Sequence, residues 1–238
     1  MATRFYTDPT NTPSVSPAFS PTWDDDTQAV RRKLVLDAAG NNDSVSFGVT
    51  GTGSVPNGIL AVQFVSEPLD AITGIAVDAW KSAFRCLESN AKANATFRFL
   101  IRGFSGDGGT ARWSLVDTED TEFDSSVLTN RYHSVSMGQN MSLEQGDRLV
   151  LEVGVIFAIA KEDPYDGTIN VTDNHATTDL PENDTETTAY NSWIETGDTF
   201  TEASGEAGWA GKVSGVASAD ISKIMGVAIA DIAKVGGV

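Results

Sequence analysis

Two histidines and one cysteine are the residues of this 238-residue chain best suited to metal binding or nucleophilic chemistry. His133, His175 and Cys86 lie far apart in the sequence, and their spacing matches no zinc-binding motif. His133 follows Tyr132 in a segment expected to be a strand, where a half-buried or surface histidine is far more common than a catalytic base. The sequence therefore predicts no catalytic centre built on these side chains.

Carboxylates are abundant, and a glycosidase needs two of them at a fixed separation in a cleft. Four stand close together in one run that is expected to be a loop: Glu119, Asp120, Glu122 and Asp124. Solubility and turn formation explain this run better than catalysis. The glycine-rich residues 103–109 lack the lysine and the following helix of a phosphate-binding loop, so we expect them to form a hairpin loop.

Calcium is the one cofactor that the composition leaves open. Residues 24–26 are three aspartates, and residues 173–186 hold several more acids among threonines and asparagines. Neither segment follows the ligand order of a known calcium loop. We therefore expect no cofactor, with Ca²⁺ as the alternative.

The net charge of −17 narrows the choice of partners. Nucleic acids and anionic membranes would both repel such a chain. A single cysteine excludes an internal disulfide. No apolar signal segment is visible, and the longest apolar stretch, residues 149–160, is too short and too interrupted to cross a bilayer. We expect synthesis in a cytoplasm without Sec-type export.

Residues 1–40 are expected to form an extended arm. Prolines at 9, 13, 17 and 21 recur every four residues and exclude a helix. Large aromatic residues are interleaved with them, which favours docking onto the same domain or a neighbour over disorder. These anchors are Phe5, Tyr6, Phe19 and Trp23. The acidic residues 24–26 and the basic residues 31–33 are expected to make a solvated turn with local ion pairs.

Residues 41–202 have the alternating pattern of β-strands. Strands are predicted at residues 44–50, 59–65, 72–80, 95–104, 111–116, 149–160, 168–172 and 192–201. Residues 95–116 form a predicted hairpin, and residues 80–94 fit a helix or a strand equally well. About eight strands predict an antiparallel two-sheet β-sandwich, jelly-roll-like, with a single β-barrel as the alternative.

Residues 203–238 hold a linker and a three-copy repeat. Lys212, Lys223 and Lys234 each open a short phrase that ends in Gly-Val, at a constant spacing of 11. Glycine flanked by β-branched residues favours short strands with turns over a helical supercoil. Open strand edges predict pairing with a partner chain or the parent domain. The expected interaction residues here are Trp209, Val213, Val216, Ile224, Val227, Val235 and Val238.

Several segments resemble a group of β-rich virion proteins of tailed phages with C-terminal Gly-Val repeats. The resemblance is carried by Arg4-Phe5-Tyr6 and by residues 15–19, 64–69, 128–131, 143–154, 179–185 and 191–195. It covers most of the chain, implies a virion component, and supplies no catalytic residue. Many members of the group end near the segment around Trp193, so the resemblance does not imply a role for the tail.

We therefore expect a non-enzymatic structural protein of a tailed-phage virion, a head decoration (cement) or accessory protein attached through its terminal segments. Its partners would be major capsid or tail proteins and further copies of itself, with a homotrimer expected. It would be made in the host bacterial cytoplasm and reside in the virion. The alternative is a tail-associated receptor- or glycan-binding module, which needs exposed aromatic residues such as Trp113 or Tyr190. An enzyme is disfavoured by the missing motifs.

Overall fold

The computed structural model describes residues 2–38, 40, 42–53, 57–75, 79–136, 141–157, 161–173 and 178–203, and the pairs 212–213, 216–217, 223–224 and 227–228. All regular elements among these residues are β-strands, which confirms the all-β class. Across the described ranges there is no helix of the length and hydropathy that a bilayer span requires.

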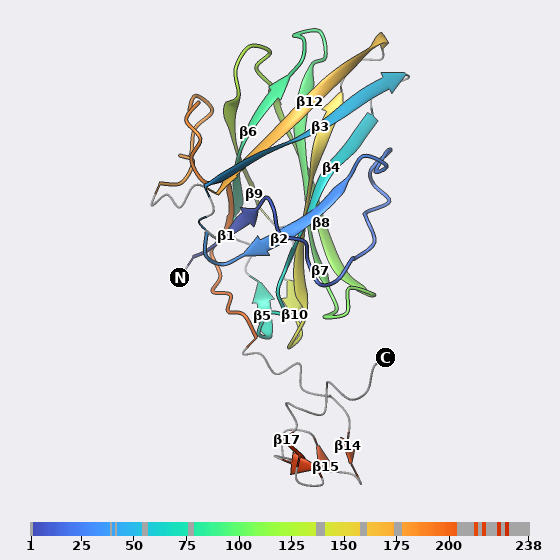
Figure 1. The fold of residues 1–238 in the computed structure, drawn as a ribbon, viewed down its shortest axis with the longest axis vertical. Coiled ribbons are helices and arrows are strands. Elements are labelled where there is room, and N and C mark those ends of the chain that lie inside the picture. Colours follow the sequence, from blue (N-terminus) through green and yellow to red (C-terminus); the bar gives the residue numbers. More distant parts are fainter. Residues whose placement is uncertain are drawn as a thin grey trace.

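Within the described residues, thirteen strands make up the body (Figure 1). They are β1 (Thr3–Asp8), β2 (Val30–Val35), β3 (Asp43–Gly53), β4 (Asn57–Ser66), β5 (Ile72–Ile75), β6 (Ala79–Glu88), β7 (Ala95–Phe104), β8 (Ala111–Glu122), β9 (Thr129–Ser136), β10 (Met141–Leu143), β11 (Arg148–Phe157), β12 (Lys161–Asp173) and β13 (Trp193–Thr196). The tail adds β14 (Lys212–Val213), β15 (Val216–Ala217), β16 (Lys223–Ile224) and β17 (Val227–Ala228).

Eleven of the body strands form one large mixed sheet. Their order is β3-β12-β6-β13-β1-β2-β4-β11-β7-β8, and β9 pairs with β6 off this path. Among the described strands, every pairing is antiparallel except that of β2 with β4, which is parallel. Strands β5 and β10 make a small separate sheet.

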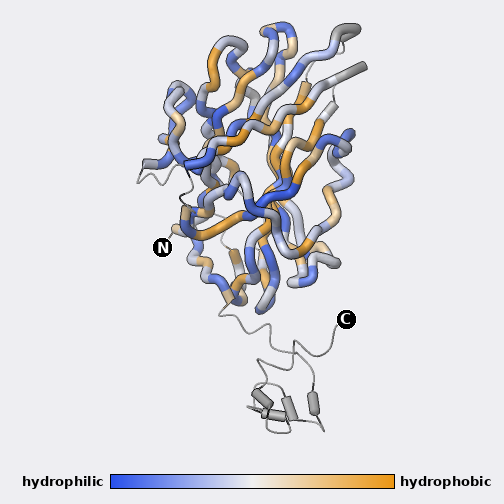
Figure 2. Tube along the Cα trace, viewed as in Figure 1, coloured by the Kyte–Doolittle hydropathy of each residue, from blue (hydrophilic) through white to orange (hydrophobic). Residues whose placement is uncertain are grey.

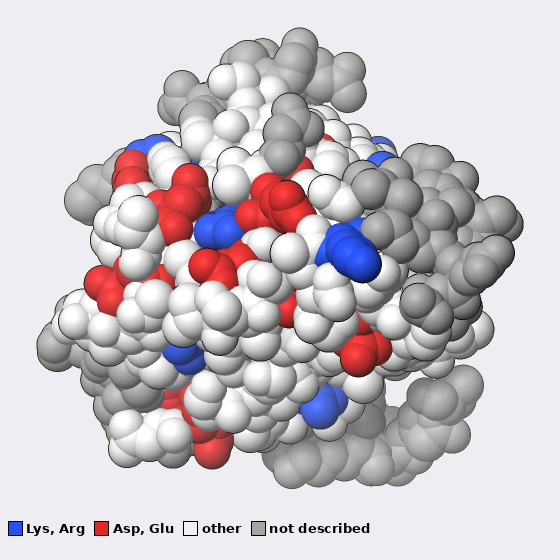
Figure 3. Space-filling view, turned by 90° about the horizontal axis from the view of Figure 1, so that it is seen from above, with Lys and Arg blue, Asp and Glu red and all other residues white. Residues whose placement is uncertain are grey.

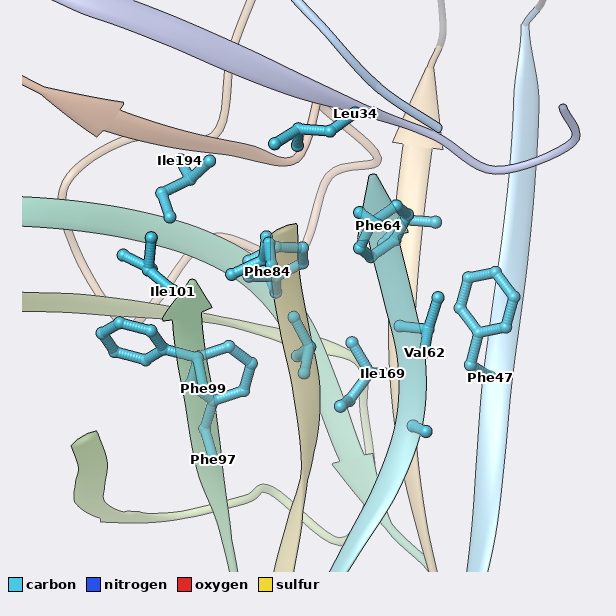
Figure 4. Packing of buried hydrophobic residues seen from close by; sticks show 14 of the residues in the cluster. Leu34, Phe47, Val62, Phe64, Phe84, Phe97, Phe99, Ile101, Ile169 and Ile194 are labelled. Carbon is cyan, nitrogen blue, oxygen red and sulfur yellow. The ribbon is translucent and has the colours of Figure 1, made fainter. Parts of the chain in front are cut away.

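The large sheet encloses its own core, because strands from both ends of its order share one apolar cluster. Figure 4 shows side chains of β3, β6 and β12 facing those of β4 and β7. Phe84 of β6 stacks on Phe97 of β7 with ring centroids 5.4 Å apart, and Phe47 of β3 meets Phe64 of β4 edge-on. Apolar stretches follow the central strands and hydrophilic ones the loops (Figure 2).

Most predicted strands are confirmed, including the β7–β8 hairpin with its glycine-rich loop. The open choice at residues 80–94 is decided for a strand, because β6 pairs with three neighbours: β9, β12 and β13. Other boundaries differ. The strand expected at 72–80 is divided between β5 and β6, and the one expected at 192–201 ends at Thr196.

The first 40 residues differ most from the sequence prediction. Strands β1 and β2 stand in the middle of the large sheet, between β13 and β4. Only residues 9–29 connect them without regular strand structure, and we call this segment the strap. The arm expected over residues 1–40 is therefore largely built into the body.

Candidate functional site

The strap lies across the face of β4, β7 and β11 that points away from the main core. Alternating residues of these strands supply that face: Leu60 and Leu100 pack with Trp23, while Val65, Phe104 and Val150 form a second cluster. Val15 and Phe19 of the strap pack against these clusters. Because strand residues alternate between faces, the same three strands serve both the core and the strap.

Glu152 of β11 is the centre of the strap's attachment. Its carboxylate is fully buried, and the Trp23 indole Nε1 donates to it at 2.8 Å. The Ser20 backbone N donates at 3.1 and 3.2 Å to its two oxygens, and Gln63 Nε2 donates at 2.9 Å. Arg102 pairs with it at 2.8 Å and also donates to the Ala18 carbonyl. A buried carboxylate with this many donors is well compensated.

One glycine makes room for the Trp23 ring. A Cβ on Gly154 would stand 2.2 Å from the carbonyl oxygen of Ile59 and 2.6 Å from Cζ3 of Trp23. Gly154 also marks a register shift between β11 and β4. The body therefore has a shaped seat for one aromatic residue of its own chain.

The charge runs beside the strap do not pair with each other as the sequence predicted. Asp24 accepts a hydrogen bond from the Gly58 backbone at 2.6 Å. Lys33 instead pairs with Glu67 at 2.8 Å, which lowers the pKa of that carboxyl. The guanidinium of Arg31 stacks over Phe19, 3.9 Å from the ring centroid. Asp24 and Arg31 thus help to tie the strap to the body, whereas Lys33 joins β2 to the end of β4.

Phe5 and Tyr6, predicted as interaction anchors, lie in β1. Phe5 is fully buried in the main core. Tyr6 lies on the other face, where its hydroxyl donates to Asp179 at 3.1 Å; burial and that carboxylate raise the pKa of Tyr6 to about 12. Phe5 is therefore part of the body's own core, and Tyr6 is engaged by Asp179 of the same chain.

The acidic loop, residues 178–192, is held by protein donors. Asp179 accepts from Arg4 at 2.6 Å, and Glu182 accepts from Lys81 at 2.9 Å. Trp193 Nε1 donates to the Leu180 carbonyl at 2.7 Å. Over the described residues, no group of three histidine, cysteine, aspartate or glutamate side chains is placed to hold a metal ion. Part of the expected calcium segment, residues 174–177 with His175, lies outside those residues.

His133 is half-buried, as predicted. Its Nε2 lies 3.0 Å from Asp117 of β8, and its ring meets Phe99 edge-on at 5.4 Å. This contact joins β9 to β8, the last strand of the sheet order. Cys86 is fully buried, and burial raises the pKa of its thiol, which keeps it in the unreactive protonated form.

The predicted acidic loop at residues 119–124 is a strand up to Glu122, because β8 continues to pair with β7 as far as Thr96. Here the structure assembles a pair of carboxyls that the sequence did not indicate. Glu88 is buried, its Oε2 accepts from Ala95 N at 2.9 Å, and its Oε1 has no donor. Burial and the neighbouring Glu122 carboxyl raise the pKa of Glu88 to about 7.

The two aromatic residues expected to form a glycan platform are engaged elsewhere. Trp113 packs over Gly103 and donates from Nε1 to the Ser142 carbonyl at 2.9 Å. Tyr190 is half-buried against the cluster of Ala83, Leu180 and Trp193. Neither residue stands free as a flat stacking surface.

The described residues of the tail form two hairpins in the same register. Each hairpin pairs two residues with two, and the second follows the first by one repeat: Lys212↔Ala217 and Val213↔Val216, then Lys223↔Ala228 and Ile224↔Val227. This confirms the prediction of short strands for the first two copies. Trp209, Val235 and Val238 lie outside the described residues.

Comparisons with known proteins give limited guidance. No protein-family model and no curated protein matches the sequence. An aminopeptidase from a marine sediment Thaumarchaeota archaeon is similar in structure, with a TM-score of 0.50 and 9% sequence identity; the match covers 82% of this chain and 36% of the aminopeptidase chain. An alpha-amino acid ester hydrolase is similar with a TM-score of 0.45 and 11% sequence identity; the match covers 73% of this chain and 35% of the hydrolase chain.

A viral protein also appears among the similar structures. The VP2 subviral particle of infectious bursal disease virus matches at TM-score 0.23 and 11% identity, over 65% of this chain and 39% of that one. The chain spans little more than a third of each of these structures. At these identities only the fold is comparable, and only the aminopeptidase match is strong enough to support that comparison.

Proposed function

We propose that the chain is a non-enzymatic structural protein of a tailed-phage virion, a head decoration or accessory protein attached through its C-terminal tail. In this proposal the body is a two-layered, jelly-roll-like β-sandwich that acts as a rigid projection. The shared core between the two ends of the strand order supports such a layered body. The resemblance of the sequence to β-rich phage proteins supports the setting.

The division of charge between body and tail carries the proposal. Residues 204–238 contain three lysines and three acids (Glu206, Asp220 and Asp231), so their net charge is zero. The whole net charge of −17 therefore belongs to residues 1–203. Figure 3 shows acidic groups gathered around fewer basic ones on one face of the body. Two bodies of this net charge repel each other, whereas two tails of zero net charge do not. The tail is therefore the segment best suited to contacts between subunits.

The described body also offers little for catalysis. His133 faces a carboxylate with a phenylalanine behind it, and the Cys86 thiol is buried and protonated. The strap, in which the sequence predicted interaction anchors, is bound to its own body around Glu152. The tail is then the segment left to make attachments.

Removal of residues 204–238 tests the proposal. The truncated body should keep the melting temperature of the full chain, because no strand of the large sheet is lost. Its copy number on purified particles, measured by quantitative mass spectrometry, should fall to background.

A full-length Lys92→Glu variant serves as the control, because Lys92 is exposed on the turn between β6 and β7. It should occupy particles like the wild type. Normal occupancy by the truncated body would contradict the proposal, as would turnover of an ester or peptide substrate by the purified chain.

A further inference from the structure

The turn between β8 and β9, residues 123–128, is joined to the ends of β6 and β7, and we call it the corner. The backbone N of Phe123 donates to the Ala95 carbonyl at 2.8 Å, and the backbone N of Glu88 donates to the Asp124 carbonyl at 3.0 Å. The Phe123 ring is buried in the main core. The corner therefore covers one end of that core.

Glu88 stands beneath the corner with one half of its carboxyl group unused. Oε2 accepts from Ala95 N at 2.9 Å, whereas Oε1 has no donor although the side chain is only 1% exposed. The carboxyl of Glu122, at the exposed end of β8, is its hydrogen-bonding neighbour. Two carboxyl groups can hydrogen-bond to each other only when one of them carries a proton. The closed corner therefore requires a proton on Oε1 of Glu88, the more buried partner.

Arg131 of β9 connects the corner to the acidic loop. Its Nη2 donates to the Glu122 carbonyl, and its Nη1 donates to the carbonyls of Asn130 at 3.1 Å and Asp184 at 3.5 Å. Its Nε is buried without an acceptor. The guanidinium also lies close enough to Glu88 to favour the charged form of that carboxyl. A cation with an unused donor is thus available to Glu88 once the proton leaves.

The remaining groups around Glu88 offer it no competing partner of opposite charge. Asp124 of the corner accepts from the backbone N of Val127 at 3.1 Å, and β12 places Gly167 opposite Glu88. Glu119 of β8 is a second buried carboxyl, and burial raises its pKa as well. A test of Glu88 must therefore separate its effect from that of Glu119.

We propose that Glu88 is a proton-controlled latch on the corner. When protonated, Glu88 donates from Oε1 to the Glu122 carboxylate and the corner stays closed. When ionised, it has given its proton to water, the two carboxylates repel each other, and Arg131 turns from the Glu122 carbonyl towards Glu88. The corner and the acidic loop at Asp184 then lose the bonds that they share through Arg131, and the corner opens.

The direction of the pH effect follows from the two states of Glu88. Its pKa is about 7 in the closed body against 4.5 for the ordinary group, so the closed form holds a proton that the open form releases. The advantage of the closed form is complete below about pH 4.5 and is lost as the pH rises to about 7. The corner should therefore open more often at mildly basic pH than at mildly acidic pH.

The latch is separate from the proposed attachment through the tail. The chain leaves the body beside Asp70, whose carboxylate accepts from Thr201 at 2.6 Å, at the end of the body that holds β5 and β10 (Figure 1). Glu88 lies at the opposite end of the long strands, where β6 ends and β7 begins. The inference therefore goes beyond the proposed function and does not depend on it.

Hydrogen–deuterium exchange of full-length chains, read by mass spectrometry at about pH 5.5 and about pH 8.5, tests the latch. Glu88→Gln is compared with the wild type at each pH, so that the intrinsic effect of pH on exchange cancels. The glutamine amide donates to Glu122 and accepts from Ala95 N at any pH, and Glu119 is unchanged. Glu144→Gln, at a side chain 74% exposed, is the matched control.

At the higher pH, peptides of the corner and of residues 181–187 should exchange faster in the wild type than in Glu88→Gln by on the order of tenfold. At the lower pH the two chains should exchange alike, and peptides of the strap should show no difference at either pH. Cys86 gives a second readout, because it is buried and pairs with Thr129 at the start of β9. At the higher pH, a thiol reagent should label it faster in the wild type than in Glu88→Gln.

Equal exchange of the corner in the wild type and Glu88→Gln at both pH values would overturn the inference. A difference spread evenly over the corner and the strap would also overturn it, because global unfolding would then be the cause. Should Glu88→Gln fail to fold, Glu122→Gln decides, since it gives Glu88 a permanent donor at an exposed position. A corner that opens in Glu122→Gln as it does in the wild type would end the proposal. Particle occupancy of the truncated body tests the proposed function independently of these results.

Discussion

The strap and the described part of the tail both lie outside the strands of the large sheet, yet their contacts differ. The strap has a seat made for it, with Gly154 beneath the Trp23 ring and a fully buried carboxylate at its centre. The described tail pairs only with itself, in hairpins of two residues a strand. A segment that carries aromatic anchors can thus be bound by its own fold, while the Lys-Val-Gly repeat is the segment proposed for assembly.

This contrast predicts that variants in the strap lower the free energy of unfolding but leave contacts between copies unchanged. Variants in the tail should weaken those contacts but leave the stability of the body unchanged. The largest effect is expected for Glu152→Ala. It leaves the Arg102 guanidinium buried without its ion-pair partner and removes the acceptor of Trp23 and Ser20. Removing one partner of a buried ion pair lowers the free energy of unfolding by about 3–5 kcal/mol. Urea denaturation of the variant and the wild type measures this loss.

The matched control for Glu152 is Glu67→Ala, which removes a partly exposed partner of Lys33. That change should cost about 1 kcal/mol or less. Equal losses for the two variants would show that the strap is not held by Glu152. A lower mass of the Glu152→Ala chain, still folded at low temperature, would show that the strap and not the tail makes subunit contacts.

A smaller effect is expected for Trp23→Phe. The ring seat stays filled, but Glu152 loses the Nε1 donor at 2.8 Å. A lost hydrogen bond to a buried charged group costs about 1.5–3 kcal/mol. Trp113→Phe is the control, because its Nε1 bond to the Ser142 carbonyl is part-exposed and neutral. If Trp113→Phe lowers the free energy of unfolding in urea more than Trp23→Phe does, the hydrogen bond from Trp23 to Glu152 contributes less to stability than its geometry indicates.

The smallest expected effect is the change of the body's stability with pH, which the tail should not share. The pKa of Glu88 rises from 4.5 to about 7 in the folded body, so the folded state holds a proton that the unfolded state releases. Stability should therefore fall as pH rises from about 5 to 8, by a few degrees in melting temperature. Glu88→Gln should flatten this slope. The proposed attachment through the tail should not change over the same range, because the tail's lysines and aspartates keep their charges.

A melting temperature that rises from pH 5 to 8 in the wild type, with the same slope in Glu88→Gln, would remove Glu88 as the cause. Loss of particle occupancy over this range would implicate a body contact rather than the tail. Either result would weaken the separation between the two regions.

Local patterns in the sequence predicted much of the sheet. Residues 95–116 carry alternating phenylalanines and a glycine-rich turn, and both signals are local, so the β7–β8 hairpin was predictable. The tail hairpins were predictable for the same reason. In contrast, β6 looked equally like a helix, and only its three strand partners, distant in sequence, decide the matter.

The strap's site could not be predicted, because it depends on pairings across more than a hundred residues. Glu152 appeared only as an interruption of the apolar stretch 149–160. A single acid on the alternate face of such a strand is the one signal that pointed to a buried polar partner. The Glu88–Glu122 pair was missed for the same reason, since β6 and the end of β8 meet only in the folded sheet.

The placement of β1 has a consequence for biosynthesis. Thr3 pairs with Thr196, and Phe200 N donates to the Thr3 hydroxyl at 2.8 Å. The first strand therefore cannot complete its contacts until nearly the last segment of the body has been synthesised. During translation, β1 would have its β2 neighbour but an open edge on the β13 side. The large sheet can close only after about 200 residues have left the ribosome, so this polypeptide folds late and slowly, and newly made chains depend on their strong negative charge to stay apart until then.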